Sequence, residues 1–248
     1  MRNFIAADLR RLSRRKPRLI ALFITYIAAV ITLYFFQDTT AWNSVSFIST
    51  ASTVFELGGV IIGIIEVLVA YSSDFKAKIM QLAIGTGIAR RKLVLAKLIE
   101  IAVLEVFSMG FLYILTIVYG LITGVSLSGA QYGELILCLA ANIVANLIYT
   151  SLSSFFIFLT QNAGLTALFY ALCMVDPIKK ALMFVGSYQN WLLKLNLTNY
   201  CYSTPVTLFK SHLLLGQFNF GALALIIAYL VIFYFATVFV FDKKELEF

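Results

Sequence analysis

The sequence predicts an all-α membrane protein, a single domain of residues 1–248 with six transmembrane helices. Hydrophobic residues make up 61% of the chain and charged residues only 12%, which is not the composition of a soluble globular domain. Apolar segments near the roughly 20 residues that cross a bilayer as a helix recur from one end of the chain to the other. The alternating segments of about ten residues that a membrane β-barrel needs are missing, so helices are expected.

The N-terminal segment is expected to form an amphipathic helix along the inner membrane surface. Its apolar residues fall on one helical face, and Pro17 separates this helix from the first span. That span is too long for the core of a cleaved signal peptide, so we expect an uncleaved helix. The apolar residues are Phe4, Ile5, Leu9 and Leu12, and the basic residues of the segment are Arg2, Arg10, Arg11, Arg14, Arg15, Lys16 and Arg18.

Hydropathy predicts six spans, separated by connections of unequal length. The fifth is expected to begin near Gly164 and meets Asp176-Pro177, where it either ends or continues past a break to about Val185. A longer outer segment, to about residue 219, contains Trp191, Tyr200, Tyr202 and Pro205, a mixture suited to the headgroup zone. The expected spans are about 19–36, 54–71, 98–123, 132–159, 164–185 and 220–241.

Basic residues orient these spans. With both termini in the cytoplasm, most of the 19 Lys and Arg residues fall on the inner side, as the positive-inside rule requires. The exceptions are Lys179, Lys180, Lys194 and Lys210. The net charge of +7 is therefore explained by orientation, and no nucleic-acid partner is expected.

The most informative stretch is the loop between the second and third spans, "DFKAKIMQLAIGTGIARRKLVLAK", residues 74–97. Its first part, to Ile84, predicts a short amphipathic helix with Phe75, Ile79 and Leu82 on the apolar face. Gly85 and Gly87 then end that helix. The basic residues of the loop are Lys76, Lys78, Arg90, Arg91, Lys92 and Lys97, and by themselves they are equally well explained as topology signals.

Motifs for catalysis are missing from the sequence. There is no G-x-x-x-x-G-K-[ST] phosphate loop, no H-E-x-x-H and no G-x-S-x-G. The three cysteines suggest no disulfide framework, and the single histidine, His212, has no ligand cluster nearby. We expect no enzymatic activity of the chain's own, and no catalytic, cofactor-binding or metal-binding residues.

Ionisable residues inside the spans are functional candidates because a bilayer makes them costly. Glu56 and Glu100 are expected to reach the headgroups, whereas Glu66 and Glu105 lie deeper. On the fourth span the polar residues Asn142, Asn146 and Thr150 share one face. Such a stripe serves either interhelical hydrogen bonding or a polar path. The residues assigned to a substrate path are Glu66, Glu105, Asn142 and Asn146. Gly59 and Gly63 predict close packing of the second span.

The loop resembles the cytoplasmic loop of type-2 ABC exporter permeases, which reads like "DFKNGTIK...GISR..I.L.K". The six-span layout, the basic N-terminal segment, the long outer segment and the charged C-terminal end resemble that family as well, so the likeness covers the whole chain. The family's Gly-Thr is missing, and Ala77 precedes Lys78 here. The matching residues are Asp74, Phe75, Lys76, Lys78, Ile79, Gly87, Ile88, Arg90, Leu95 and Lys97.

This resemblance implies that the short helix is a coupling helix, docked on a separate ABC ATPase subunit present in two copies. ATP and Mg would be bound by that ATPase. A second permease chain, identical or homologous, would complete the membrane unit, with membrane lipids around it. By analogy Phe75, Ile79 and Leu82 form the apolar docking face and Lys76 and Lys78 pair with carboxylates of the ATPase. Arg90 and Arg91 would anchor the helix to the membrane or to the N-terminal segment.

The expected function is ATP-driven export in a bacterial plasma (inner) membrane. The loop is most similar to permeases that secrete or clear antimicrobial or amphipathic peptides, including bacteriocin export and immunity systems. One alternative is export of drugs, ions or polysaccharide by the same machinery. A second is an ATP-independent, proton-coupled carrier that uses Glu66 and Glu105, and a third is a structural membrane subunit.

Overall fold

The chain is helical in the computed structural model, which describes residues 2–37, 42–76, 79–188 and 197–243. Five helices are long and apolar enough to cross a membrane. This supports a multi-pass, all-helical membrane protein. The five are α2 (Lys16–Gln37), α3 (Ser44–Lys76, apolar to Ser72), α5 (Arg90–Ile122), α6 (Gly129–Thr160) and α11 (Phe220–Lys243).

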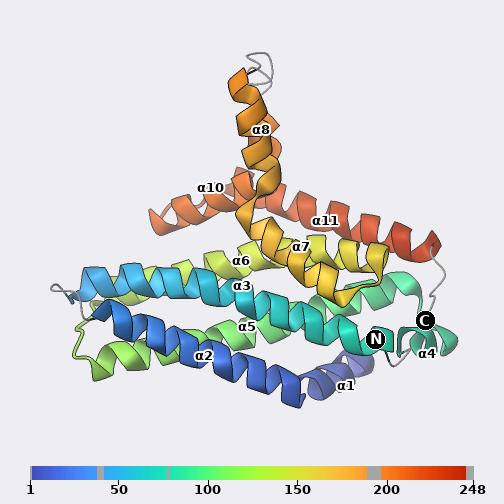
Figure 1. Cartoon of the computed structure of the whole chain (residues 1–248), viewed down its shortest axis with the longest axis horizontal. Coiled ribbons are helices and arrows are strands. Elements are labelled where there is room, and N and C mark those ends of the chain that lie inside the picture. Colours follow the sequence, from blue (N-terminus) through green and yellow to red (C-terminus); the bar gives the residue numbers. More distant parts are fainter. Residues whose placement is uncertain (1, 38–41, 77–78, 189–196, 244–248) are drawn as a thin grey trace.

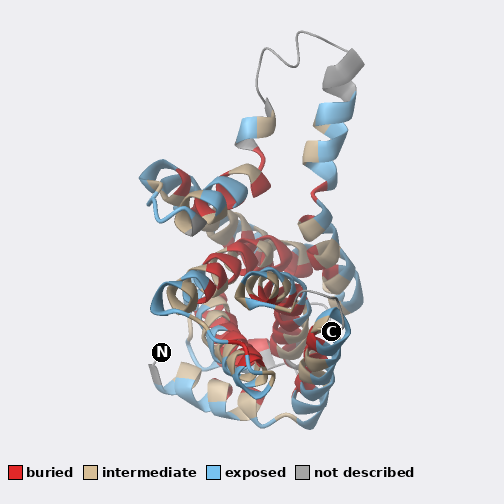
Figure 2. Cartoon of the chain, turned by 90° about the vertical axis from the view of Figure 1, so that its left-hand side faces the viewer, coloured by how far each residue is buried: buried red, intermediate tan, exposed pale blue. Residues whose placement is uncertain are grey.

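These long helices lie side by side along the long axis of the molecule (Figure 1). Helix α3 packs against α2, α5 and α6, and α6 also packs against α11, so α3 and α6 form the centre of the bundle. Buried residues face the middle of the bundle and exposed ones face outward (Figure 2). Many of the outward residues are large and apolar, such as Phe23 and Phe107, which is the surface that a lipid environment requires.

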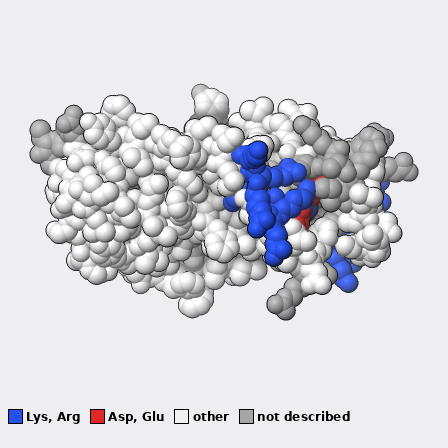
Figure 3. Space-filling view, turned by 90° about the horizontal axis from the view of Figure 1, so that it is seen from below, with Lys and Arg blue, Asp and Glu red and all other residues white. Residues whose placement is uncertain are grey.

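One end of the bundle carries α1 (Arg2–Ser13), the short helix α4 (Ile79–Gly85) and the last turn of α11 (Figure 1). We call it the α4 end. The N-terminal segment is helical, with Leu12 fully buried and Phe4 and Leu9 packed against the core, and its place along the inner membrane surface stays a prediction. Seen from below, the basic side chains gather toward this end, and most of the remaining visible surface is uncharged (Figure 3).

The fifth predicted span, about 164–185, is divided in the structure. Helix α7 (Ala163–Val175) has only 13 residues and is followed by a separate helix, α8 (Pro177–Tyr188). Asp176 between them adopts a left-handed conformation with φ of 52°, and Pro177 lacks the N–H group that a continuous helix needs. The expected break therefore lies at Asp176-Pro177, and α8 projects away from the bundle beyond it (Figure 1).

The segment that follows α8 contains a 3₁₀ turn, η1 (Leu197–Tyr200), and helix α10 (Ser203–Leu214). Tyr202, expected among the lipid headgroups, is buried, and its hydroxyl donates a hydrogen bond to the backbone oxygen of Cys173 at 2.6 Å. Pro205 is also buried. Trp191 lies outside the described residues. The outer segment is thus partly packed into the protein, where α10 contacts α6 and α11.

Candidate functional site: the α4 end and the polar interior

Five charged side chains from α1, α3 and α5 meet at the α4 end. Lys97 is fully buried and forms ion pairs with Asp74 on α3 (2.5 Å), Glu100 one turn further along α5 (2.8 Å) and Asp8 on α1. Arg11 adds pairs with Asp8 and with Asp74 (2.6 Å). Because two cations are shared among three carboxylates, this ion cluster ties three helices together. Removing any one member would leave a buried charge without its counter-charge.

Asp8 titrates abnormally in this environment. Burial alone raises the pKa of its carboxyl, but the hydrogen bond from Arg11 and the positive charge of Lys97 outweigh that effect. The pKa of Asp8 therefore lies below its ordinary value, so the carboxylate form is strongly favoured in the folded protein. In its charged form Asp8 pairs with Lys97 of α5, which adds to the apolar contacts of Leu12 that hold α1 on the bundle.

The quoted loop forms a shorter helix than its sequence pattern predicted. Helix α3 continues to Lys76, so Asp74 belongs to α3 and is buried in the ion cluster, and α4 covers only Ile79–Gly85. The predicted stop is confirmed: α4 ends at Gly85, and Gly87 adopts φ of 89°, which favours glycine.

Helix α4 has one face on the protein and one face free. Met80 is fully buried and Ala83 nearly so, and both belong to the core cluster that contains Leu93 of α5. Leu82, on the other side, is 68% exposed. Of the predicted apolar face the structure describes only Leu82, so that face stays a prediction. Lys78 lies outside the described residues, as do the side chains of Phe75, Lys76 and Ile79.

Arg90 connects α5 to the end of α11. Its guanidinium donates hydrogen bonds to the backbone oxygens of Phe241 and Asp242, the latter at 3.2 Å, and lies 5.3 Å from the centre of the Phe241 ring. These contacts attach Arg90 to the last turn of α11, whose carbonyls carry partial negative charge. Its anchoring to the membrane or to the N-terminal segment stays a prediction. Arg91 is exposed, and its backbone oxygen accepts a hydrogen bond from Tyr234.

Glu66 is paired with Arg18. Two guanidinium nitrogens of Arg18, at the start of α2, donate to the two carboxylate oxygens of Glu66 at 2.6 and 2.7 Å, and the hydroxyl of Ser108 donates to Glu66 at 2.8 Å. Glu66 is fully buried and Arg18 is 6% exposed. This pairing gives Glu66 a structural role between α2, α3 and α5. Arg18 is therefore not one of the exposed charges of the N-terminal segment.

Glu105 has no such partner. It is fully buried on α5, and within the described part of the chain neither carboxyl oxygen has a hydrogen-bond partner. Asn146 and Tyr170 are among its polar neighbours. Helix α3 comes close here, since a Cβ atom at Gly63 would collide with the Tyr170 hydroxyl and one at Gly59 would lie 2.9 Å from Asn146 Nδ2. The predicted close packing at Gly59 and Gly63 is confirmed.

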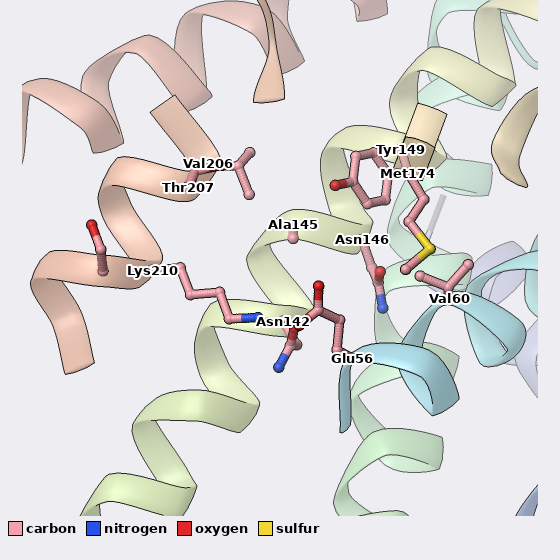
Figure 4. A pocket seen from close by; sticks show the side chains of 11 residues that line it. Glu56, Val60, Asn142, Ala145, Asn146, Tyr149, Met174, Val206, Thr207 and Lys210 are labelled. Carbon is pink, nitrogen blue, oxygen red and sulfur yellow. Dashed lines mark hydrogen bonds and ion pairs between the residues drawn. The ribbon is translucent and has the colours of Figure 1, made fainter. Parts of the chain in front are cut away.

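The polar stripe on α6 faces the interior as predicted, with Asn142, Asn146 and Thr150 at most 5% exposed. The Asn142 Nδ2 donates to the backbone oxygen of Cys138 in its own helix, and its Oδ1 accepts from Lys210 of α10 at 3.4 Å. Both asparagines line a cavity of about 370 Å³ between α3, α6 and α10 (Figure 4). Of the four predicted path residues, Asn142 and Asn146 lie together at this cavity, whereas Glu66 is engaged elsewhere.

Two charged residues that sequence reasoning placed near the headgroups have partners in the structure. Glu100 is fully buried and pairs with Lys97, whereas Glu56 is half exposed and pairs with Lys210 at 2.9 Å. Asp8 was not singled out at all, although its place on the apolar face of α1, one turn from Leu12, was a usable signal. Lys210 carried no signal, because its partner lies more than 150 positions earlier in the chain.

Comparisons with known proteins do not identify the chain. A scan of protein-family models found none that matches, and a search of curated proteins found no match either.

Proposed function

We propose that the chain is the permease subunit of an ATP-driven exporter and that a separate ABC ATPase docks at the α4 end. The single observation that carries the proposal is how α4 is attached. One face of the helix is held in the core by Met80, while Leu82 on the other side is 68% exposed. Leu82 would form the docking face together with Phe75 and Ile79, the other apolar residues that the loop sequence assigns to it.

The contacts that join α4 to the neighbouring helices would transmit a movement of the ATPase to the membrane-spanning helices. Helix α4 follows α3 directly in sequence, and α3 is joined to α1 and α5 through Asp74 and its ion pairs. Arg90 joins the beginning of α5 to the end of α11. Because buried ion clusters have preferred geometries and packed helices move as units, displacement of α4 would move several helices together. In this account ATP-driven closure of the ATPases shifts the bundles and opens the path outward.

The working unit would contain two permease chains, identical or homologous, and two ATPase subunits that bind ATP and Mg. We propose a bacterial plasma membrane as its location, with both termini in the cytoplasm. This orientation is supported by the basic side chains that gather toward the α4 end (Figure 3). The proposed substrates are antimicrobial or other amphipathic peptides, and lipophilic compounds are the alternative within the same machinery.

Substitution of the exposed α4 residue tests the docking surface. The tagged chain, purified in mild detergent from its native host, is expected to retain an ATP-binding subunit, and Leu82→Asp is expected to lose it. Phe75→Asp and Ile79→Asp, within the same loop, should have the same effect. Leu215→Asp is the matched control, because Leu215 is 74% exposed at the end of α10, outside α4. An ATPase that stays bound to the Leu82→Asp chain would contradict this docking site.

A second candidate function, a proton-coupled carrier, is favoured by Glu105. A fully buried carboxyl with no hydrogen-bond partner among the described residues is a natural place for a proton. In that case collapse of the proton gradient would abolish transport, and Glu105→Gln would uncouple it. An ATP-driven exporter would instead continue to transport while ATP is supplied.

A further inference from the structure

The cavity beside α10 contains one basic and one acidic side chain that face each other. Lys210 of α10 extends across it and its ammonium lies 2.9 Å from Glu56 of α3 (Figure 4). Asn142 and Asn146 of α6 line the cavity, and Tyr149 and Met174 complete the side next to α7. Its volume of about 370 Å³ falls within the range of small-ligand pockets, roughly 300–1,000 Å³.

The ion pair is accessible from the cavity. The side chain of Glu56 is 52% exposed and that of Lys210 is 21% exposed. A single ion contact at 2.9 Å joins the two charges. A ligand that offers a charge of opposite sign to each partner could therefore separate them without a large loss. This distinguishes the pair from Arg18–Glu66, which is buried and held by two direct hydrogen bonds.

Asn146 lines the cavity beside Asn142 and is 2% exposed. Its amide also interacts with the buried Glu105 carboxyl of α5, which leaves one of its two N–H groups for a ligand. A ligand carbonyl or phosphate oxygen next to that N–H group would be favoured. Asn142 offers an acceptor already engaged by Lys210 at 3.4 Å, a weak contact that a ligand could replace.

We infer that this cavity is a binding site for a zwitterion, with the ligand's ammonium on Glu56, its acidic group on Lys210 and an acceptor oxygen facing Asn146. A ligand with a single charge would separate the ion pair and leave one partner without a counter-charge. A zwitterion replaces one ion pair with two. The inference names the substrate class of the proposed transport path and depends on the proposed function in that respect, but binding itself requires no ATPase.

Two sources supply this chemistry, and one titration series separates them. The purified chain in nanodiscs is titrated with the dipeptide alanylalanine, with its N-acetylated form and with its amidated form. In parallel, retention of phosphatidylethanolamine against phosphatidylglycerol is measured by native mass spectrometry. Preference for the unmodified dipeptide identifies a peptide end, and preference for phosphatidylethanolamine identifies a lipid headgroup. Either result supports a zwitterion site.

Variants assign the binding to this cavity. Glu56→Gln and Lys210→Met are each expected to weaken binding of the preferred zwitterion at least tenfold, and Lys180→Met, on α8, should leave it unchanged. The exchanged double variant Glu56→Lys with Lys210→Glu keeps an ion pair, so it should stay folded and bind with the ligand reversed. The inference would be overturned if the singly charged analogues bound as tightly as the zwitterion, or if Glu56→Gln and Lys210→Met left the affinity unchanged. It would also be overturned if neither zwitterion bound.

Discussion

The ammonium of Lys97 lies 2.5 Å from the Asp74 carboxylate, and both side chains are fully buried at the α4 end. These residues mark the first and last positions of the loop between the second and third predicted spans. The pair therefore closes the loop at its base, so that the short helix α4 is presented from a fixed support. Asp8 and Glu100 share the same ammonium.

Lys97→Met is expected to lower the free energy of unfolding by about 3–5 kcal/mol, because three carboxylates lose their common counter-charge. Thermal unfolding in detergent measures the effect. The double variant Lys97→Met with Asp74→Asn should recover part of the lost free energy of unfolding, because it also removes one of the carboxylates left without a counter-charge. Lys92→Met, an exposed neighbour on the same helix, is the control and should be close to neutral. Equal stability of the Lys97 and Lys92 variants would contradict the buried cluster.

The Arg18–Glu66 pair is expected to show strong energetic coupling. Arg18→Gln and Glu66→Gln should each destabilise the protein, and the double variant should cost less than their sum, with a coupling energy of roughly 0.5–3 kcal/mol. The coupling energy is obtained by measuring the free energy of unfolding of the unmodified chain, the two single variants and the double variant. Glu134→Gln, on the exposed side of α6, supplies a comparison in which no coupling to Arg18 is expected. Additive effects would mean that the pair does not form.

Gly63→Ala should destabilise the protein by about 1–3 kcal/mol, because the added Cβ atom would collide with Tyr170 and force α3 and α7 apart. Gly110→Ala is a matched control within α5, since an added Cβ there meets nothing within 4 Å. That change should be neutral or slightly stabilising, as alanine favours a helix. A Gly63 variant as stable as the Gly110 variant would show that the helices are not this close.

Acid is expected to loosen α1 through Asp8. The folded-state pKa of Asp8 lies below its ordinary value of 3.8. Its stabilising contribution is therefore complete above pH 3.8 and is lost as the pH falls through the lowered pKa. Asp8→Asn should lower the free energy of unfolding at neutral pH and make that free energy fall less steeply as the pH is lowered. Unfolding curves recorded from neutral pH to below 3.8 test this. An unchanged acid slope in Asp8→Asn would assign the pH dependence to other carboxyls.

Elements that depend on local pattern were predictable from sequence. The long apolar helices and the glycine stop after α4 follow from residue spacing, and the structure confirms both. The break at Asp176-Pro177 was visible, but its consequence was not. A proline shows that a helix is interrupted, and only packing decides the direction of the next helix.

The pairing of buried charges was beyond sequence reasoning. Glu66 and Glu105 look equivalent in the sequence, yet Glu66 has Arg18 as a partner while Glu105 has none among the described residues. The difference arises from contacts between positions about 50 residues apart. Lys210 and Glu56 likewise meet only because α10 packs against α6.

The central claim is that this chain takes its energy from a separate ATPase at the α4 end. Native mass spectrometry of the unmodified chain, tagged and gently purified from its native host, tests it most directly. The account predicts a complex with two permease chains and two ATP-binding subunits, which separates when Leu82 is replaced by Asp. A chain that is recovered without any ATP-binding subunit under several mild conditions would contradict the claim and make Glu105 the leading functional residue.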